Sequence, residues 1–163
     1  WENRIQARAR RRVNRKCGVG ISMKLLLVED NYAEAELLKK LIEKFSEEIE
    51  VTHCETGTEA VDEVRSSIEE SRIYDLMILD LNLPALDGHG VIEKVRSDYG
   101  SRLPIIVLTT SQSKKDVERV YAGGANCYIP KPVDLAEYRA VTHALLTFWL
   151  NHVVVPSAVE GKG

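Results

Sequence analysis

Three carboxylate side chains stand directly after two short apolar runs in this sequence. Glu29 and Asp30 follow the run LLLV at residues 25–28, and Asp80 follows the run LMIL at residues 76–79. Unbroken apolar runs of this length are typical of strands that are buried on both faces of a sheet. In an open parallel α/β sheet, ligands bind beyond the carboxyl ends of the strands. We therefore expect the three carboxylates to meet at the edge of a sheet where such folds place their chemistry.

A hydroxyl group and an ammonium group follow two further apolar runs. Thr109 comes directly after the run IIVL at residues 105–108, and Lys131 lies between two prolines just after the run CYI at residues 127–129. A single carboxylate could merely cap a loop, and Lys131 alone could be a solvated surface lysine. The flanking prolines favour a functional lysine because they fix the backbone at that point. Chance does not readily place reactive groups after four separate runs, so we expect one common site.

Three carboxylates in close contact require a compensating positive charge. Glu29, Asp30 and Asp80 would repel one another, and their pKa values would rise unless a cation lay between them. The group offers oxygen ligands only, which suits Mg²⁺. Four histidines have no partner at ligand spacing and are interpreted as ordinary surface or helix residues, namely His53, His89, His143 and His152. The sequence therefore predicts a magnesium site.

Five strands and five helices alternate along the sequence and would position these groups. Strands are predicted at about residues 24–28, 49–54, 76–79, 105–109 and 126–129, and helices at about residues 31–45, 56–71, 91–97, 113–122 and 135–151. Two of the helices begin with capping patterns, Thr56 to Glu59 and Ser113 to Asp116. Right-handed crossovers between the strands give an α/β fold with a parallel sheet that is covered on both faces.

The reactive residues, taken in order, resemble those of a known family. Glu-Asp, Asp, Thr and Lys-Pro at these spacings are similar to the receiver domain of two-component response regulators, over about residues 23–152. Within that family the sequence most resembles the stand-alone regulators that partner bacterial phytochromes, through residues 110–135 and the aromatic end of the last helix. The resemblance implies a flavodoxin-like, doubly wound sheet of five strands in the order 2-1-3-4-5, with five helices.

The resemblance also assigns roles to the carboxylates. It implies that Asp80 accepts a phosphoryl group from a histidine kinase, as a nucleophile that becomes an aspartyl phosphate. Asp30 and Asp80 would bind Mg²⁺ directly, Glu29 would act through water, and the backbone carbonyl of Asn82 would complete the protein ligands. Many family members have Asp where this chain has Glu29. Among the metal-binding residues, Glu29 therefore matches the pattern of the family least closely.

Three further residues receive roles from the same resemblance. Lys131 would neutralise the phosphoryl oxygens, and Thr109 would donate its hydroxyl to them. Tyr128 matches the switch aromatic of the family, which turns inward when that hydroxyl moves, although it could also be a plain strand aromatic. The peptide bond between Lys131 and Pro132 is expected to be cis, as in the family.

Two other functions are alternatives to the phosphoacceptor. A hydrolase with an aspartyl nucleophile, such as the haloacid-dehalogenase-like enzymes, needs a second Asp two residues after the first, and here that position is Asn82. We therefore expect no enzymatic turnover of a substrate. An interaction module that works without phosphorylation remains an alternative for the same fold. An acyl phosphate that forms only with Mg²⁺ would separate the phosphoacceptor from both.

The composition indicates one soluble domain. The chain has 163 residues, of which 44% are hydrophobic, enough to fill one core. No apolar run approaches the ~18 residues of a membrane helix, and no signal-peptide core is present. Cys17, Cys54 and Cys127 form no C-x-x-C pair. Neither a zinc site nor a disulfide framework is indicated, and a reducing cytoplasm is the expected location.

Charge is unevenly distributed along the chain. The net charge is -3, but residues 1–22 carry seven basic side chains and one acidic one, which leaves 15 basic and 24 acidic residues elsewhere. An Arg-rich segment could be a nucleic-acid arm, but this one precedes Met23, a typical start for a receiver domain. We expect a basic disordered leader at 1–22, a receiver domain at 23–152 and a flexible tail at 153–163. Neither nucleic acid nor a membrane is an expected partner.

Partners are implied by the resemblance and by the last helix. The expected phosphoryl donor is a sensor histidine kinase, of the phytochrome type by the nearest likeness. Only 12 residues follow Asn151, so the output is expected to be a protein contact or transfer to a phosphotransfer protein. One stripe of the last helix is predicted to pack on the sheet, namely Leu135, Tyr138, Val141, Thr142, Leu145, Phe148 and Trp149. Leu146, Leu150 and Val153 would extend it into a homodimer surface, unless the C-terminal segment folds back on its own domain.

Overall fold

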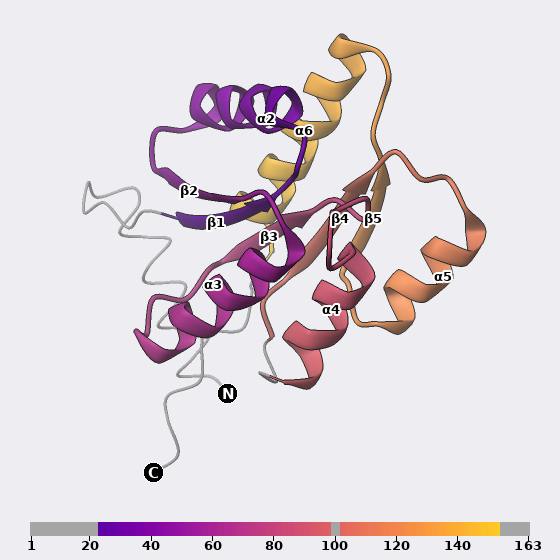
Figure 1. Ribbon diagram of the computed structural model, residues 1–163. Coiled ribbons are helices and arrows are strands. Elements are labelled where there is room, and N and C mark those ends of the chain that lie inside the picture. The colour runs from indigo at the N-terminus through magenta and orange to yellow at the C-terminus, as the bar shows by residue number, and fades with distance from the viewer. Residues whose placement is uncertain (1–22, 99–101, 154–163) are drawn as a thin grey trace.

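A five-stranded parallel sheet forms the centre of the molecule (Figure 1). The computed structural model describes residues 23–98 and 102–153. The strands lie in the order β2-β1-β3-β4-β5. Their bounds are β1 Met23–Val28, β2 Ile49–Cys54, β3 Leu76–Leu79, β4 Ile105–Thr109 and β5 Cys127–Pro130. The predicted strand order and the doubly wound fold class are confirmed.

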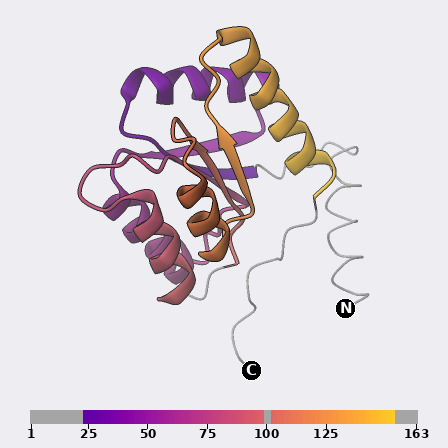
Figure 2. The ribbon, with the colours of Figure 1, turned by 90° about the vertical axis from the view of Figure 1, so that its right-hand side faces the viewer.

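Helices cover both faces of the sheet. Helices α2 (Tyr32–Phe45) and α6 (Leu135–Asn151) pack on one face. Helices α3 (Gly57–Glu69), α4 (Gly88–Ser97) and α5 (Lys114–Ala122) pack on the other. Figure 2 shows the same two layers from the side. The apolar runs of β1, β3 and β4 are buried almost completely, because both of their faces meet helices.

Side chains at the helix starts explain where the helices begin. Asn31 accepts hydrogen bonds from the backbone N–H groups of Ala33 and Glu34 at the start of α2. Thr56 accepts from the N–H of Glu59, as the capping pattern predicts. The reciprocal half of that pattern differs, since the Glu59 carboxylate accepts from the N–H of Glu55 at 2.9 Å instead of from Thr56. The caps place the first turn of each helix beside the carboxyl edge of the sheet.

Strand register brings the reactive positions to a common edge. Val28 pairs with Leu79, so the residues that follow them, Glu29 and Asp80, leave the sheet side by side. At the ends of β4 and β5, the N–H of Lys131 donates to the carbonyl oxygen of Thr109 at 2.7 Å. The edge predicted from the four apolar runs is therefore the edge that the fold builds.

The last helix packs on the sheet through only part of the predicted stripe, and it adds Leu146 to that contact. Leu146 is fully buried, with 0% of its surface exposed, whereas Leu135 and Phe148 are 46% and 56% exposed. The prediction that Leu146 extends an exposed dimer surface is wrong. The reason is the way in which α6 lies on the sheet and α2, which centres the contact on Tyr138, Thr142, Leu145 and Leu146. Helical spacing alone gives the width of an apolar stripe but not the line along which the helix rests.

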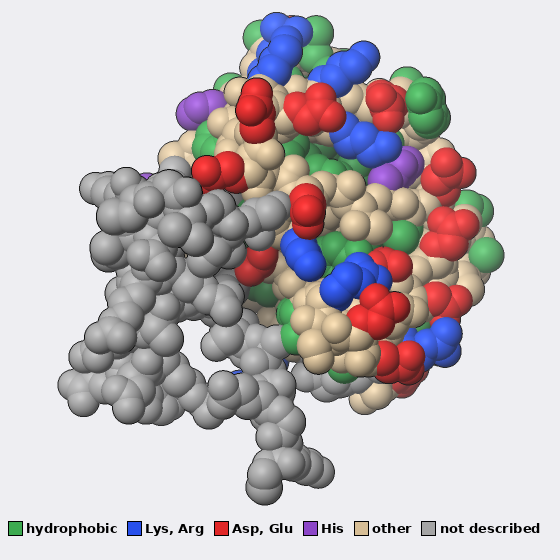
Figure 3. Space-filling view, turned by 90° about the vertical axis from the view of Figure 1, so that its left-hand side faces the viewer, with side chains coloured by type: hydrophobic (Ala, Val, Ile, Leu, Met, Phe, Trp, Pro, Cys, Tyr) green, Lys and Arg blue, Asp and Glu red, His purple; other side chains and the backbone are tan. Residues whose placement is uncertain are grey.

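The described part of the surface carries side chains of both charges. On the described part of the face in Figure 3, acidic side chains are interspersed with Lys and Arg and no broad basic patch is visible. None of the helices within the described ranges is both long and apolar enough to cross a membrane. The predicted leader at 1–22 and nearly all of the predicted tail at 153–163 lie outside the described residues.

Candidate functional site

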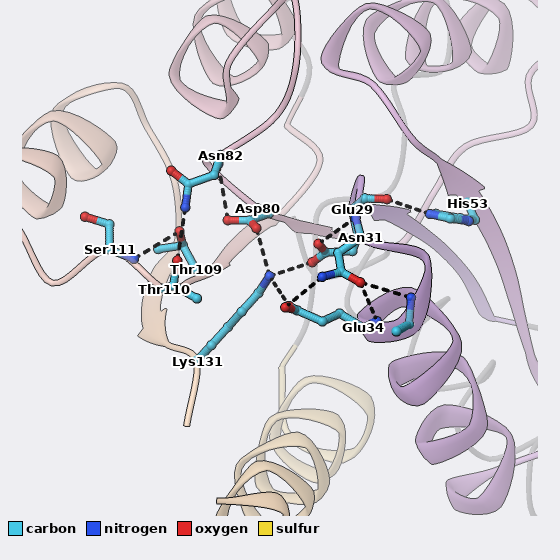
Figure 4. A network of polar contacts seen from close by, with 11 residues as sticks. Glu29, Asn31, Glu34, His53, Asp80, Asn82, Thr109, Thr110, Ser111 and Lys131 are labelled. Atoms are coloured by element: carbon cyan, nitrogen blue, oxygen red, sulfur yellow. Dashed lines mark hydrogen bonds and ion pairs between the residues drawn. The ribbon is translucent and has the colours of Figure 1, made fainter. Parts of the chain in front are cut away.

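Lys131 lies at the centre of a buried group of carboxylates (Figure 4). Its Nζ atom is 2.6 Å from Oε2 of Glu29, 2.8 Å from Oδ2 of Asp80 and 2.6 Å from Oε2 of Glu34. The side chains of Lys131, Glu29 and Asp80 are 5%, 6% and 6% exposed. The structure thus brings Glu29, Asp80 and Lys131 together as predicted, and it adds Glu34.

Burial and ion pairing act in opposite directions on these groups. Burial raises the pKa of Glu29 from 4.5 to about 6, although the hydrogen bond and charge of Lys131 pull it down. Burial acts to lower the pKa of Lys131, but its hydrogen bonds to Asp80, Glu29 and Glu34 outweigh this, so the pKa lies above the ordinary value for lysine. Lys131 therefore stays charged. Its single positive charge is shared among three carboxylate groups.

Three carboxylates at this edge have the arrangement of a metal-binding group. Glu29, Asp30 and Asp80 each offer one oxygen, and these oxygens all lie within 4.8 Å of one another. Glu29 and Asp80 are buried while Asp30 is exposed, so the group opens to solvent on one side. All the donors are carboxylate oxygens, which hard divalent cations such as Mg²⁺ prefer. The donor set fits a magnesium ion, as the sequence predicts.

The loop after Asp80 is held close to the helix that follows it. The Oδ1 atom of Asp80 accepts a hydrogen bond from the N–H of Asn82 at 3.3 Å, and Nδ2 of Asn82 donates to Oγ1 of Thr110 at 3.1 Å. A Cβ atom at Gly88 would lie 2.5 Å from the carbonyl oxygen of Asp80. Only glycine allows the start of α4 to pack so closely against the strand end that carries Asp80.

Thr109 and Tyr128 belong to a second group beside the Lys131 cluster. Thr109 is 0% exposed, and its Oγ1 accepts from the N–H of Ser111 at 3.4 Å. The Tyr128 hydroxyl donates to the carbonyl oxygen of Ser111 at 2.9 Å. Both predicted switch residues therefore contact the same loop after β4. Neither hydrogen bond joins the Lys131 cluster, so the predicted contact of Thr109 with a phosphoryl group stays a prediction.

The predicted cis bond between Lys131 and Pro132 is wrong, because the described peptide bonds are all trans. The trans form of a bond before proline is intrinsically favoured by about 0.5–1 kcal/mol. In this structure Lys131 is already held by its backbone hydrogen bond to Thr109 and by its three ion pairs. Its ammonium group reaches the site without a cis bond.

Several residues of the site were not predicted from the sequence. Glu34 reaches Lys131 from the first turn of α2, and its Oε1 accepts from Nδ2 of Asn31 at 3.4 Å. The spacing from Asn31 to Glu34 is that of a capping pair, which could have drawn attention to it. His53, interpreted as an ordinary residue, places Nε2 2.8 Å from the carbonyl oxygen of Glu29. No local signal marked that contact.

A second histidine contact, made by His89, ties α4 to α5. Nε2 of His89 lies 3.2 Å from Oδ1 of Asp116, and the His89 side chain is only 8% exposed. The Ser111 hydroxyl donates to Oδ2 of the same carboxylate at 2.6 Å. The hydrogen bond from Ser111, followed by that from His89, holds the pKa of Asp116 below its ordinary value. This His89–Asp116–Ser111 chain anchors the loop that follows Thr109.

Comparisons with known proteins match this geometry. A family model for the response regulator receiver domain matches residues 25–143. The response regulator Rcp1 of Synechocystis sp. is 31% identical over 137 residues, covering 82% of this chain and 93% of that protein. A manganese-bound structure of Rcp1 has a TM-score of 0.74 at 31% identity and covers 82% of this chain and 99% of that one.

Two further solved structures are similar. The phosphorylated cyanobacterial phytochrome response regulator RcpA has a TM-score of 0.77 at 34% identity, covering 84% of this chain and all 100% of that one. The receiver domain of the sensor histidine kinase PA1611 of Pseudomonas aeruginosa, solved with a magnesium ion in its active-site cleft, has a TM-score of 0.63 at 30% identity. The match covers 80% of this chain and 98% of that one.

Fold, donor set and family match lead to the same assignment. Relatives with this sheet have been solved with Mn²⁺ and Mg²⁺, and the present chain offers a carboxylate group that fits such an ion. Phosphorylation by a histidine kinase is the general function of the matched family. The chain belongs to the receiver domain family of response regulators.

Proposed function

We propose that Asp80 is the residue of this receiver domain that accepts the phosphoryl group. The observation that carries the proposal is the position of its carboxylate, buried at the end of β3, 2.8 Å from Lys131 Nζ and within the group that fits a divalent cation. Within that group, Asp80 follows the central strand β3, whereas Glu29 and Asp30 follow β1. The strand fixes the nucleophile, and the charged neighbours supply the electrostatic stabilisation that phosphoryl transfer requires.

The transfer needs one bond to form and one to break. A carboxylate oxygen of Asp80 attacks phosphorus, and the bond between phosphorus and the histidine nitrogen of the kinase breaks, so that the electron pair returns to the imidazole. The Lys131 ammonium stabilises the negative charge of the phosphoryl oxygens. Thr109, on the neighbouring strand, would donate its hydroxyl to the transferred group. These roles follow from position and chemistry and require no further acid or base from the chain.

Three side chains and one carbonyl would hold the cation. Asp30 and Asp80 would bind it directly, Glu29 would act through a water molecule, and the backbone carbonyl of Asn82 would complete the protein ligands. The exposed Asp30 lies on the open side of the group, where an ion can enter. When bound, the ion would neutralise phosphoryl oxygens and so lower the electrostatic barrier to attack by Asp80.

The donor and the output are inferred from similarity. Likeness to Rcp1 and to the phytochrome response regulator RcpA supports a phytochrome-type sensor histidine kinase as the donor. The phosphorylated domain would then act through protein contacts in the cytoplasm, or pass its phosphoryl group to a phosphotransfer protein, and not as an enzyme with a substrate of its own. Tyr128 would report phosphorylation by turning with Thr109.

A homodimer through α5, β5 and α6 is part of the same proposal. Val133, Leu135 and Phe148 are large apolar side chains that the fold leaves exposed in this region. Exposed apolar groups of this kind support an interface. Sedimentation of the protein against a Phe148→Asp variant tests it, and two monomeric samples, with and without phosphorylation, would rule the dimer out.

Phosphorylation with a small donor tests the central assignment. Acetyl phosphate and Mg²⁺ should add one phosphoryl group, detected by intact-protein mass spectrometry, and Asp80→Asn should abolish it. Asp98→Asn is the matched control, because Asp98 lies at the end of α4 and pairs with Lys94 instead of Lys131. Equal labelling of the Asp80→Asn variant would refute the assignment. Folded protein that takes up no phosphoryl group would favour a module that works without phosphorylation.

A further inference from the structure

Lys131 uses all of its hydrogen-bond donors on carboxylates. An ammonium group has three N–H donors, and the three partners of Lys131 Nζ lie at 2.6, 2.6 and 2.8 Å. Two of these partners, Glu29 and Asp80, also belong to the group that fits a divalent cation. The third partner, Glu34, lies outside that group and comes from a different element, α2.

Sharing carboxylates between an ammonium group and a cation creates a conflict. A cation that draws on the oxygens of Glu29 and Asp80 takes negative charge away from Lys131, and the two positive groups repel each other. The side chains of Glu29, Asp80 and Lys131 are 6% exposed or less, so water screens this repulsion only weakly. Lys131 must nevertheless stay in the site and stay charged if it is to meet a phosphoryl group.

Glu34 offers a way to resolve that conflict. Its Oε2 atom is 2.6 Å from Lys131 Nζ, and its side chain is 36% exposed, so much of it is shielded. Its other oxygen accepts from Asn31 Nδ2 at 3.4 Å. It also lies in the first turn of α2, where the helix dipole stabilises a negative charge. Glu34 is therefore held in place by its own helix, independently of the cation.

We propose that Glu34 is a positioning residue that keeps Lys131 in place when a divalent cation occupies the Glu29, Asp30 and Asp80 group. Glu34 acts through Lys131 and contacts neither the cation nor the phosphoryl group. Its carboxylate lets the ammonium group and the cation occupy the site together. This inference rests on the proposed function, since it concerns how the same site is assembled before phosphoryl transfer.

A double-mutant cycle on Mg²⁺ binding tests the inference. Calorimetric titration with Mg²⁺ alone is carried out on the wild type, Glu34→Gln, Lys131→Met and the double variant. In the wild-type background, Glu34→Gln should weaken Mg²⁺ binding by about fivefold, because Lys131 then competes harder for Glu29 and Asp80. In the Lys131→Met background the same substitution should change the affinity by less than about twofold, because the ammonium group that Glu34 holds is no longer present.

A matched control separates this effect from a loss of charge. Glu36→Gln removes the same charge from the same helix, but Glu36 pairs with Lys39 at 3.0 Å instead of with Lys131. It should leave the Mg²⁺ affinity within about twofold of the wild type. Thermal unfolding without Mg²⁺ checks that every variant is folded before titration.

Two outcomes would overturn the inference. One is an equal effect of Glu34→Gln with and without Lys131, which would mean that Glu34 acts only by its charge. The other is an effect no larger than that of Glu36→Gln. Because the titration contains no phosphoryl donor, it reads the role of Glu34 separately from phosphorylation. A failed cycle in a protein that still labels Asp80 would reject this inference alone, and absent labelling with a positive cycle would reject only the proposed function.

Discussion

The Tyr128 hydroxyl donates a hydrogen bond to the carbonyl oxygen of Ser111 at 2.9 Å. This contact links β5 to the loop that begins at Thr109, whose own hydroxyl accepts from the N–H of Ser111. Any rotation of Tyr128 must break the bond to Ser111. The resting position of the predicted switch residue is therefore tied to the loop whose movement it would follow.

Tyr128→Phe removes that link without changing the shape of the ring. We expect a loss of about 0.5–1.5 kcal/mol in the free energy of unfolding, measured by urea denaturation, because one net hydrogen bond is lost. Phosphorylation at Asp80 should continue. Tyr32→Phe serves as the control, since Tyr32 is 69% exposed and should show almost no change. A Tyr128→Phe variant as stable as the wild type would mean that the hydrogen bond to Ser111 does not hold the loop.

Leu146 and Phe148 lie two positions apart in α6 but should respond very differently to truncation. Leu146 is 0% exposed, so Leu146→Ala should lower the free energy of unfolding by about 2–5 kcal/mol through the cavity that it leaves. Phe148→Ala should cost much less in a monomer, because 56% of the Phe148 surface is already exposed. Urea denaturation at low protein concentration measures both. Similar losses for the two variants would contradict the observed placement of α6.

Ser111→Ala should move the titration of Asp116 toward its ordinary range. The hydrogen bond from Ser111 is the largest cause that lowers the pKa of Asp116, followed by the bond from His89, with Arg119 adding a favourable charge. A carboxyl group whose pKa is depressed in the folded state stabilises the fold above its unfolded pKa of about 3.8, and that contribution is lost as the pH falls through the folded value. Carboxyl-carbon NMR should therefore show a higher pKa for Asp116 in the variant. An unchanged titration would show that Ser111 does not stabilise the ionised form.

Mg²⁺ should raise the midpoint of thermal unfolding in a concentration-dependent way, because an ion that binds only the folded state stabilises it by mass action. Asp30→Asn should remove most of this shift by deleting the exposed carboxylate of the metal-binding group. Asp98→Asn removes a carboxylate at the far end of α4 and should retain the full shift. The expectation fails if Asp30→Asn and Asp98→Asn respond to Mg²⁺ alike.

Local patterns in the sequence were enough to predict the sheet and most of the site. The apolar runs that become β1, β3 and β4 are recognisable because strands buried on both faces exclude polar side chains. Once the strands are parallel, their carboxyl ends share one edge, so Asp80 and Lys131 had to come close together. The helix caps at Thr56 and Ser113 were visible for a similar reason, since capping depends on residues only three positions apart.

Only the tertiary structure decided which side chains meet across large sequence separations. Glu34 and Lys131 are 97 positions apart, and their contact depends on how the start of α2 is placed over the edge of the sheet. The bond between His89 and Asp116 likewise depends on how α4 and α5 lie beside each other. The burial of Leu146 was settled by the line along which α6 rests on the sheet. Each of these outcomes depends on how whole helices and strands are placed relative to one another. That placement results from the packing of the entire core, and the local spacing of residues does not encode it.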